Sequence, residues 1–222
     1  MNAMQTPAEN RPFDAVIFDV GGVLTGSPFT AMAAVARQSS IDPRLFISIA
    51  VGAGDADYAD GTHPWHRLER GEITVDAFNE ATDAMARQHG LDCFPPLPSA
   101  EFIESAMGVR PEMINLAQQV RAYGYATAVL TNNVVAWGGW RKLVGVESFD
   151  VVIDSCEVGM RKPEARIFAL ACERVGVAAE RCLFLDDMSE NVAGAAAFGM
   201  QTLLVDATDA ARNEVLSRLC AS

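Results

Sequence analysis

Five short apolar runs that each lead into a polar residue constrain the fold of this chain more than any other feature. The runs span Ala15–Phe18, Ala126–Leu130, Val151–Ile153, Cys182–Leu185 and Thr202–Val205. Continuous apolar runs of this length are typical of strands that are buried on both faces of a parallel sheet. Helical patterns lie between the later runs, so the sequence predicts an α/β fold with a Rossmann-like, doubly wound parallel sheet.

The predicted helices of the sheet domain span Pro111–Tyr123, Pro163–Val175 and Ser189–Phe198. Pro111 and Pro163 suit the first position of a helix, and a glycine follows the end of each predicted helix. In open sheets of this kind, ligands bind at the carboxyl ends of the strands. Polar side chains at that edge are therefore the first candidates for function.

The segment between residues 30 and 108 interrupts the alternation of strands and helices, because it contains helical stretches but no clear buried strand. We therefore predict a helical cap domain over residues 30–108, inserted into a core domain that is built from residues 13–29 and 109–222. Residues 1–12 are expected to form a flexible N-terminus.

Composition excludes several classes of partner. The 222 residues include 17 Lys and Arg against 29 Asp and Glu, so the formal net charge is −12. Such a chain repels nucleic acids and anionic membranes, and no apolar run reaches the roughly 18 residues of a membrane-spanning helix. The first residues lack the apolar stretch of a signal peptide, and the five cysteines are scattered. We therefore expect a cytoplasmic protein with reduced thiols and without nucleic-acid or membrane partners.

Three groups of polar residues stand near predicted strand ends or helix starts. Asp19 follows the first strand, Thr131 and Asn132 follow the second, and Lys162 lies just before a predicted helix. A carboxylate on a buried strand can act as a nucleophile or a metal ligand, and a hydroxyl, a backbone N–H and an ammonium can bind an anion. Taken singly, each group also has an ordinary role in a loop, a turn or a solvated surface.

Asp186 and Asp187 are the least ordinary feature of the sequence. Two adjacent carboxylates after an apolar strand repel each other unless a cation or a proton lies between them. Carboxylate oxygens are the ligands that Mg²⁺ prefers in proteins. The pair therefore predicts a magnesium site, and Asn191 lies one helical turn further along the chain.

The order Asp, Thr, Lys and Asp-Asp, each at or just beyond a strand end, resembles the haloacid dehalogenase-like (HAD) superfamily over nearly the full chain. The likeness is greatest to the amino-terminal phosphatase domain of soluble epoxide hydrolase and to the HAD domain fused to some acyl-CoA dehydrogenase-like proteins. It rests on Asp154–Glu164, Phe184–Asp187 and Gly71–Thr74 as well as on the four motifs. The resemblance implies a Mg²⁺-dependent hydrolase, a phosphatase that acts on a small phosphorylated metabolite.

The resemblance also implies roles for the matching residues. Asp19 would be the nucleophile that forms an aspartyl-phosphate. Thr131 and the backbone of Asn132 would bind the phosphoryl oxygens, Lys162 would neutralise their charge, and Asn191 would help to orient the site.

The magnesium ligands are implied in the same way. Mg²⁺ would be held by the carboxylates of Asp19 and Asp187 and by the backbone carbonyl of Gly21. Asp186 would lie behind these ligands or bind the ion through water. The charge of the ion and that of Lys162 would stabilise phosphoryl transfer, which depends mainly on positioning and electrostatics.

Gly21 departs from the family pattern. Phosphatases of this superfamily usually carry a second Asp two residues after the nucleophile, which protonates the leaving group and later activates water. Glycine cannot donate a proton, and such acid–base help accelerates a reaction by about 10²–10⁴-fold. Either the substrate has a good leaving group, or another residue such as Thr25, Ser27 or one from the insert supplies the proton.

Two other functions compete with a phosphatase. The domain could bind a phosphorylated ligand without hydrolysing it, or it could be a metal-independent 2-haloacid dehalogenase that uses Asp19 to displace a halide. The second alternative is disfavoured because Asp186 and Asp187, without a cation, would repel an anionic haloacid. A homodimer is a possible assembly.

Two aromatic motifs carry less information. His63 and His66 have the spacing of metal ligands, but no further His or Cys is close in the sequence. Trp137 and Trp140 follow the Thr131 motif, where they either line the entrance of a cleft or pack on a core or a partner surface.

Overall fold

All five predicted strands are present and run parallel. In the computed structural model, which describes residues 11–52 and 61–220, they form one sheet in the order β3-β2-β1-β4-β5. Their bounds are β1 (Ala15–Phe18), β2 (Ala126–Thr131), β3 (Val151–Asp154), β4 (Cys182–Asp186) and β5 (Gln201–Leu204). The predicted α/β fold is therefore confirmed, with the last strand displaced by one residue from its predicted bounds.

Alternate side chains of each strand pack on opposite faces of the sheet, which explains why the runs are apolar throughout. Val16 and Phe18 of β1 join one buried cluster. Ala15 and Ile17 join another on the opposite face. Neither face is left to solvent, as is usual for parallel sheets.

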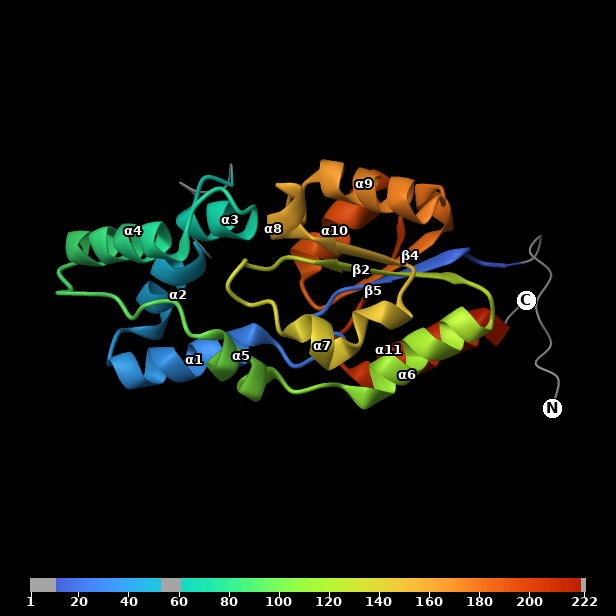
Figure 1. The fold of residues 1–222 in the computed structure, drawn as a ribbon, viewed down its shortest axis with the longest axis horizontal. Coiled ribbons are helices and arrows are strands. Elements are labelled where there is room, and N and C mark those ends of the chain that lie inside the picture. Colours follow the sequence, from blue (N-terminus) through green and yellow to red (C-terminus); the bar gives the residue numbers. More distant parts are fainter. Residues whose placement is uncertain (1–10, 53–60, 221–222) are drawn as a thin grey trace.

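Helices cover both faces, as Figure 1 shows. α6 (Pro111–Ala122) and α11 (Thr208–Cys220) contribute to the cluster on one face. α9 (Ala165–Val175) and α10 (Ser189–Phe198) contribute to the cluster on the other. Short helices lie in the connections between these elements: α7 (Trp140–Val144), η3 (Val146–Ser148), α8 (Ser155–Val158) and η4 (Ala179–Arg181).

The predicted helix at Pro163–Val175 begins later than expected. α9 starts at Ala165, and Glu164 is its N-cap residue. Pro163, which follows a cis peptide bond, lies in the preceding loop. The side chain of Asn132 holds that loop, because its amide accepts from the backbone N–H of Lys162 and donates to the Lys162 carbonyl. The prediction that Pro163 occupies the first position of this helix is therefore wrong.

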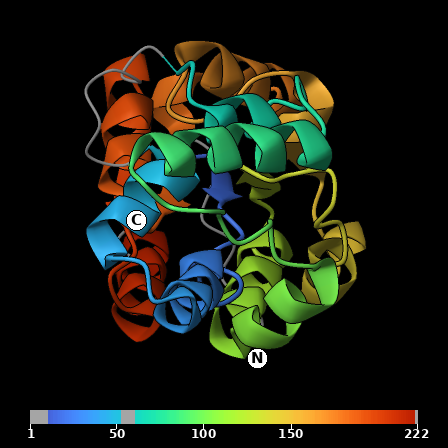
Figure 2. The ribbon, with the colours of Figure 1, turned by 90° about the vertical axis from the view of Figure 1, so that its left-hand side faces the viewer.

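A group of helices lies beyond the carboxyl ends of the strands, as Figures 1 and 2 show. It comprises α1 (Pro28–Ser39), α2 (Pro43–Val51), α3 (Pro64–Glu69), α4 (Val75–Gln88) and α5 (Ala100–Met107), and we call it the helical insert. It has a hydrophobic cluster of its own, which also takes in Val134 and Trp137 from the loop after β2. No strand occurs in its described residues.

Three further observations concern the predictions for the whole chain. Residues 1–10 of the predicted flexible N-terminus lie outside the described residues, whereas the carbonyls of Arg11 and Pro12 accept hydrogen bonds from Arg181 and Gln201. The four cysteines whose side chains are described are free thiols. Within residues 11–52 and 61–220, none of the helices has the length and apolar character needed to cross a bilayer.

Phe168 is the largest buried side chain with which α9 packs on the sheet, and its truncation should be costly. The ring is fully buried and lies edge-on to Phe184 of β4, with 5.6 Å between the ring centroids. We expect Phe168→Ala to lower the free energy of unfolding by about 3–5 kcal/mol, as large-to-small core substitutions do. Urea denaturation checks this, with the exposed Glu173→Ala on the same helix as control. Equal losses in the two variants would contradict the packing described here.

Candidate active site

The strand order brings the predicted site residues to one edge of the sheet. β1 lies between β2 and β4, and Phe18 is paired with Val129 and with Leu185. Asp19 and Asp186 each follow these paired residues directly, and the backbone N–H of Asp19 still donates to the Leu185 carbonyl at 2.9 Å. The two carboxylates therefore project from neighbouring strand ends.

Lys162 lies at the centre of this edge and is fully buried. Its ammonium donates to Oδ2 of Asp186 at 2.6 Å and to the Leu130 carbonyl at 3.0 Å, and it lies 2.9 Å from Oδ1 of Asp19. One side chain thus bonds to groups at the ends of three adjacent strands. Burial of an ammonium is tolerated only when such partners are present.

Two asparagines fix the surroundings of this lysine. The side chain of Asn132 forms the paired hydrogen bonds with the Lys162 backbone described above. The amide nitrogen of Asn191 donates to both carboxylate oxygens of Asp186, at 3.0 and 3.1 Å. The Met188 backbone N–H donates to Oδ1 of Asp186 as well. Both oxygens of Asp186 are therefore engaged inside the protein.

Burial and the proximity of three carboxylates shift the pKa values of the site residues. Burial raises the pKa of Asp19 to about 8, and repulsion from Asp186 and Asp187 adds to this while Lys162 acts in the opposite direction. Burial and the charge of Asp186 raise the pKa of Asp187 to about 6. Burial alone would lower the pKa of Lys162, but attraction to Asp186 and Asp19 outweighs it and raises that pKa.

The donor set fits a divalent cation. Asp19, Asp186 and Asp187 each offer a carboxylate oxygen, and these oxygens lie within 4.8 Å of one another. Ionisation of all three beside one ammonium leaves two negative charges uncompensated, and no ion pair among the described residues neutralises Asp187. Hard oxygen donors with this excess charge are suited to Mg²⁺.

A cavity of about 410 Å³ opens onto these groups, between the strand ends and the helical insert. Its lining includes every predicted site residue except Asp186, namely Asp19, Gly21, Thr131, Asn132, Lys162, Asp187 and Asn191. Asp186 is fully buried behind Lys162. Its contacts favour a role in holding Lys162 and Asn191.

The far side of the cavity comes from the helical insert and is mainly apolar. Phe29, Val51, Trp65, Ile103 and Met107 line it, together with Trp137 from the loop after β2 and Trp140, the first residue of α7. Trp137 and Trp140 are also buried in hydrophobic clusters, so they both pack in a core and line the cavity. All three tryptophans of the chain therefore face the cavity.

Sequence reasoning missed Glu69 and Arg161, which also line the cavity. They form a buried ion pair between the helical insert and the core, with 2.6 Å between Arg161 Nε and Glu69 Oε2. The two residues are 92 positions apart, so no local pattern links them. The one available signal was the position of Arg161 directly before Lys162.

Gly21 has a close neighbour that the sequence did not reveal. A Cβ atom placed on Gly21 would lie 2.9 Å from Cδ of Pro28, the first residue of α1. The pyrrolidine ring thus occupies part of the space that a side chain at position 21 would need. Thr25 and Ser27 are not among the residues that line the cavity, and the Thr25 hydroxyl is bonded to the Val20 and Gly26 carbonyls.

The chain is similar to several characterised proteins. It is 33% identical to mouse (Mus musculus) acyl-CoA dehydrogenase family member 10 over 95% of its own length and 19% of the relative. It is 28% identical to bifunctional epoxide hydrolase 2 of Rattus norvegicus, over 89% of its own length and 37% of the relative. Against phosphatase MT3486 of Mycobacterium tuberculosis (strain CDC 1551 / Oshkosh), the identity is 28% over 92% of this chain and 93% of the relative. The chain thus spans well under half of the first two relatives.

Solved structures show the same fold. HAD family enzyme bt-2542 of Bacteroides thetaiotaomicron, in complex with magnesium and inorganic phosphate, superposes with a TM-score of 0.57 at 19% identity, over 86% of this chain and 93% of that one. L-2-haloacid dehalogenase of Xanthobacter autotrophicus superposes with a TM-score of 0.56 at 21% identity, over 92% and 83% of the two chains.

The family assignment rests on a match over most of the sequence. Residues 13–199 match the model of the haloacid dehalogenase-like hydrolases. This range includes strands β1 to β4 and the helical insert, and it contains every residue of the candidate site. The resemblance inferred from the four motifs is confirmed: the chain belongs to the haloacid dehalogenase-like hydrolase family.

Proposed function

We propose that this protein is a Mg²⁺-dependent phosphatase that hydrolyses a phosphate monoester of a small metabolite through an aspartyl-phosphate at Asp19. The observation that carries the proposal is the placement of the Asp19 carboxylate in a cavity, beside a buried lysine and two further carboxylates. Phosphatases among the relatives support it. The helical insert would act as the cap over this site.

The hydrogen bonds of Asp19 indicate which oxygen would attack. Oδ1 accepts from the Val20 backbone N–H at 2.7 Å and lies 2.9 Å from the Lys162 ammonium. Oδ2 has no partner among the described residues and is the atom available to the phosphorus. In the first step a bond forms from this oxygen to phosphorus, and the bond to the leaving oxygen breaks. Water then attacks phosphorus, which releases inorganic phosphate and restores the carboxylate.

The surrounding residues would bind and orient the transferred group. The Lys162 ammonium, the Thr131 hydroxyl and the Asn132 N–H would contact its oxygens, and Asn191 would keep Asp186 and hence Lys162 in place. Asp19, Asp187 and the Gly21 carbonyl would hold Mg²⁺. The ion would neutralise the negative charge that develops on the phosphoryl oxygens. The apolar wall of the insert would contact an organic body and exclude water.

Gly21 limits which esters would react well. A leaving oxygen of low basicity departs without a proton donor, whereas an alkoxide does not. Among the described residues of the insert, the titratable side chains that line the cavity are His66, Glu104 and Glu69, and Glu69 is paired with Arg161. We therefore propose restricted scope, with preference for esters that have good leaving groups. A metal-independent dehalogenase is disfavoured, because Asp187 lines the same cavity and would repel a haloacid.

The first prediction from the proposed function concerns the nucleophile. Asp19→Asn should abolish phosphate release, because an amide cannot form the acyl phosphate. Acid-quenched wild-type protein should carry one phosphoryl group by intact mass, and the variant none. Tryptophan fluorescence should still report binding of phosphate esters to the variant. Binding without turnover by the wild-type protein, on aryl and acyl phosphates alike, would instead favour a phosphoryl-ligand binding module.

The second prediction concerns the cation. EDTA should remove activity, and Asp187→Asn should weaken Mg²⁺ affinity by at least about tenfold, since a charged ligand is lost. Titration calorimetry with Mg²⁺ alone measures this without turnover. Glu190→Gln is the matched control, because Glu190 lines the same cavity but lies outside the carboxylate cluster. Unchanged Mg²⁺ affinity in Asp187→Asn would contradict the assigned ligand set.

The third prediction concerns the missing acid. Gly21→Asp alone places its Cβ against Pro28, so the new side chain should be misplaced or the loop displaced. The double variant Gly21→Asp/Pro28→Ala removes that contact and should raise kcat on alkyl phosphates by about 10²-fold or more, the usual range of general acid catalysis. Pro28→Ala alone is the control. Equal kcat values for the double variant and this control would show that the proton donor is not limiting.

A further inference from the structure

Arg161 is a buried cation in the cavity that the proposed reaction does not use. It directly precedes Lys162, is 9% exposed and lines the cavity. Its Nε donates to Oε2 of Glu69 at 2.6 Å. Glu69 is the last residue of α3 and is itself 5% exposed.

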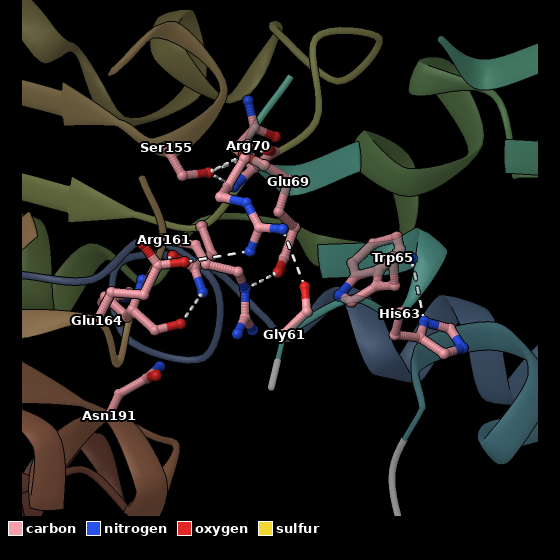
Figure 3. A network of polar contacts seen from close by, with 12 residues as sticks. Gly61, His63, Trp65, Glu69, Arg70, Ser155, Arg161, Glu164 and Asn191 are labelled. Carbon is pink, nitrogen blue, oxygen red and sulfur yellow. Dashed lines mark hydrogen bonds and ion pairs between the residues drawn. The ribbon is translucent and has the colours of Figure 1, made fainter. Parts of the chain in front are cut away.

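The position of Glu69 is fixed by contacts between the helical insert and the core. Its backbone carbonyl accepts from the Ser155 hydroxyl at 2.6 Å. The next residue, Arg70, donates to Glu164 at 3.1 Å, and a Cβ on Gly71 would lie 2.6 Å from the Cys156 carbonyl oxygen. Figure 3 shows this network around Arg161. The guanidinium is therefore held in one place by a carboxylate that cannot easily move.

The ion pair leaves most of the guanidinium unused. An arginine side chain has five N–H donors, and its two terminal nitrogens form a planar fork that matches an oxyanion. Among the described residues only Nε has a partner. Figure 3 shows the terminal nitrogens of Arg161 on no dashed line, and Arg161 lines the cavity together with Gly61 and Asn191.

This arrangement differs from that of an ion pair that serves stability alone. A carboxylate that only neutralised a buried arginine would be expected to accept from two of its nitrogens, which is the frequent geometry of such pairs. Here Glu69 binds the guanidinium from the side. The two terminal nitrogens, which match an anion, are left without a partner in the described part of the chain, on a residue that lines the cavity and directly precedes the proposed phosphoryl-binding lysine.

We propose that Arg161 binds a second anionic group of the substrate, positioned for this by Glu69. The substrate class is then a phosphate monoester that also carries a carboxylate or a second phosphate. This inference rests on the proposed phosphatase function, which supplies the site of the first phosphate. Arg161 would determine specificity and take no part in the transfer step.

Kinetics on matched esters test the proposal. Phenyl phosphate and the 3- and 4-carboxyphenyl phosphates have good leaving groups and differ in the second anion, and the 2-carboxy isomer is left out because its carboxyl group would itself protonate the leaving oxygen. We expect wild-type protein to prefer one carboxylated isomer. Glu69→Gln/Arg161→Met, which leaves no buried charge unpaired, should lower kcat/KM for that isomer by about 10- to 100-fold through KM, the factor that one charge-assisted contact supplies. Phenyl phosphate should change less than about twofold, and Arg161→Lys should be intermediate.

The control is Arg166→Met. Arg166 has the same Nε to carboxylate pairing at 2.6 Å, with Glu164, but is exposed and does not line the cavity. It should leave both substrates unaffected. A wild-type protein without preference for any carboxylated isomer would overturn the proposal. So would equal losses on both substrates in the double variant, which would show that the pair is structural.

A binding experiment separates failure of this inference from failure of the phosphatase function. Tryptophan fluorescence with saturating Mg²⁺ reports the affinities of 3-phosphonopropionate and propylphosphonate, which cannot be hydrolysed. Tighter binding of the first, lost in Glu69→Gln/Arg161→Met, supports Arg161 even if no ester is turned over. Equal binding of the two refutes it even if phenyl phosphate is hydrolysed. Ethane-1,2-diphosphonate in the same assay tells whether a second phosphate is preferred over a carboxylate.

Discussion

The buried ammonium of Lys162 is the interaction on which the site depends. It joins Asp186 and Asp19 at the ends of two strands and the Leu130 carbonyl of a third. An unpaired charge at this depth would be strongly unfavourable, so the three strand ends and the loop that carries Lys162 must assemble together. The same requirement explains two sets of side-chain hydrogen bonds. Asn132 bonds to the backbone of Lys162, and Asn191 donates to the carboxylate of Asp186.

The strands and the candidate site could be predicted because both depend on local sequence. A run such as Ala15–Phe18 is buried on both faces, so its apolar character shows directly in the sequence. Parallel strands place Asp19 and Asp186 at the same edge of the sheet, and the strand order, in which β1 lies beside β4, makes them neighbours. Asp187 and Thr131 follow from the same rule, whereas Lys162 lies in the loop before α9 and was identified by its position ahead of a predicted helix and by the family motif. The carboxylates and the hydroxyl of the candidate site could thus be predicted from the ends of the buried strands.

The remaining features depend on contacts between distant segments. The start of α9 is displaced because Asn132 holds the loop before it, and the proximity of Pro28 to Gly21 follows from the approach of α1. The pairing of Glu69 with Arg161 joins the insert to the core across 92 residues. The sequence pattern within one segment does not indicate contacts with a distant segment. α2 is a different case, because Asp42 before Pro43 is an N-cap signal that was available in the sequence.

The aromatic loop after β2 gives the two parts of the molecule a common interior. Val134 and Trp137 belong to the core domain by sequence, yet they pack in the hydrophobic cluster of the helical insert, and the Trp137 indole donates to the Pro98 carbonyl. Thr131 and Asn132 lie only a few residues before them. The insert is therefore not an exchangeable module: a chimera with the insert of another protein would have to bring this loop with it, or leave a gap in the insert's core beside the phosphoryl-binding residues.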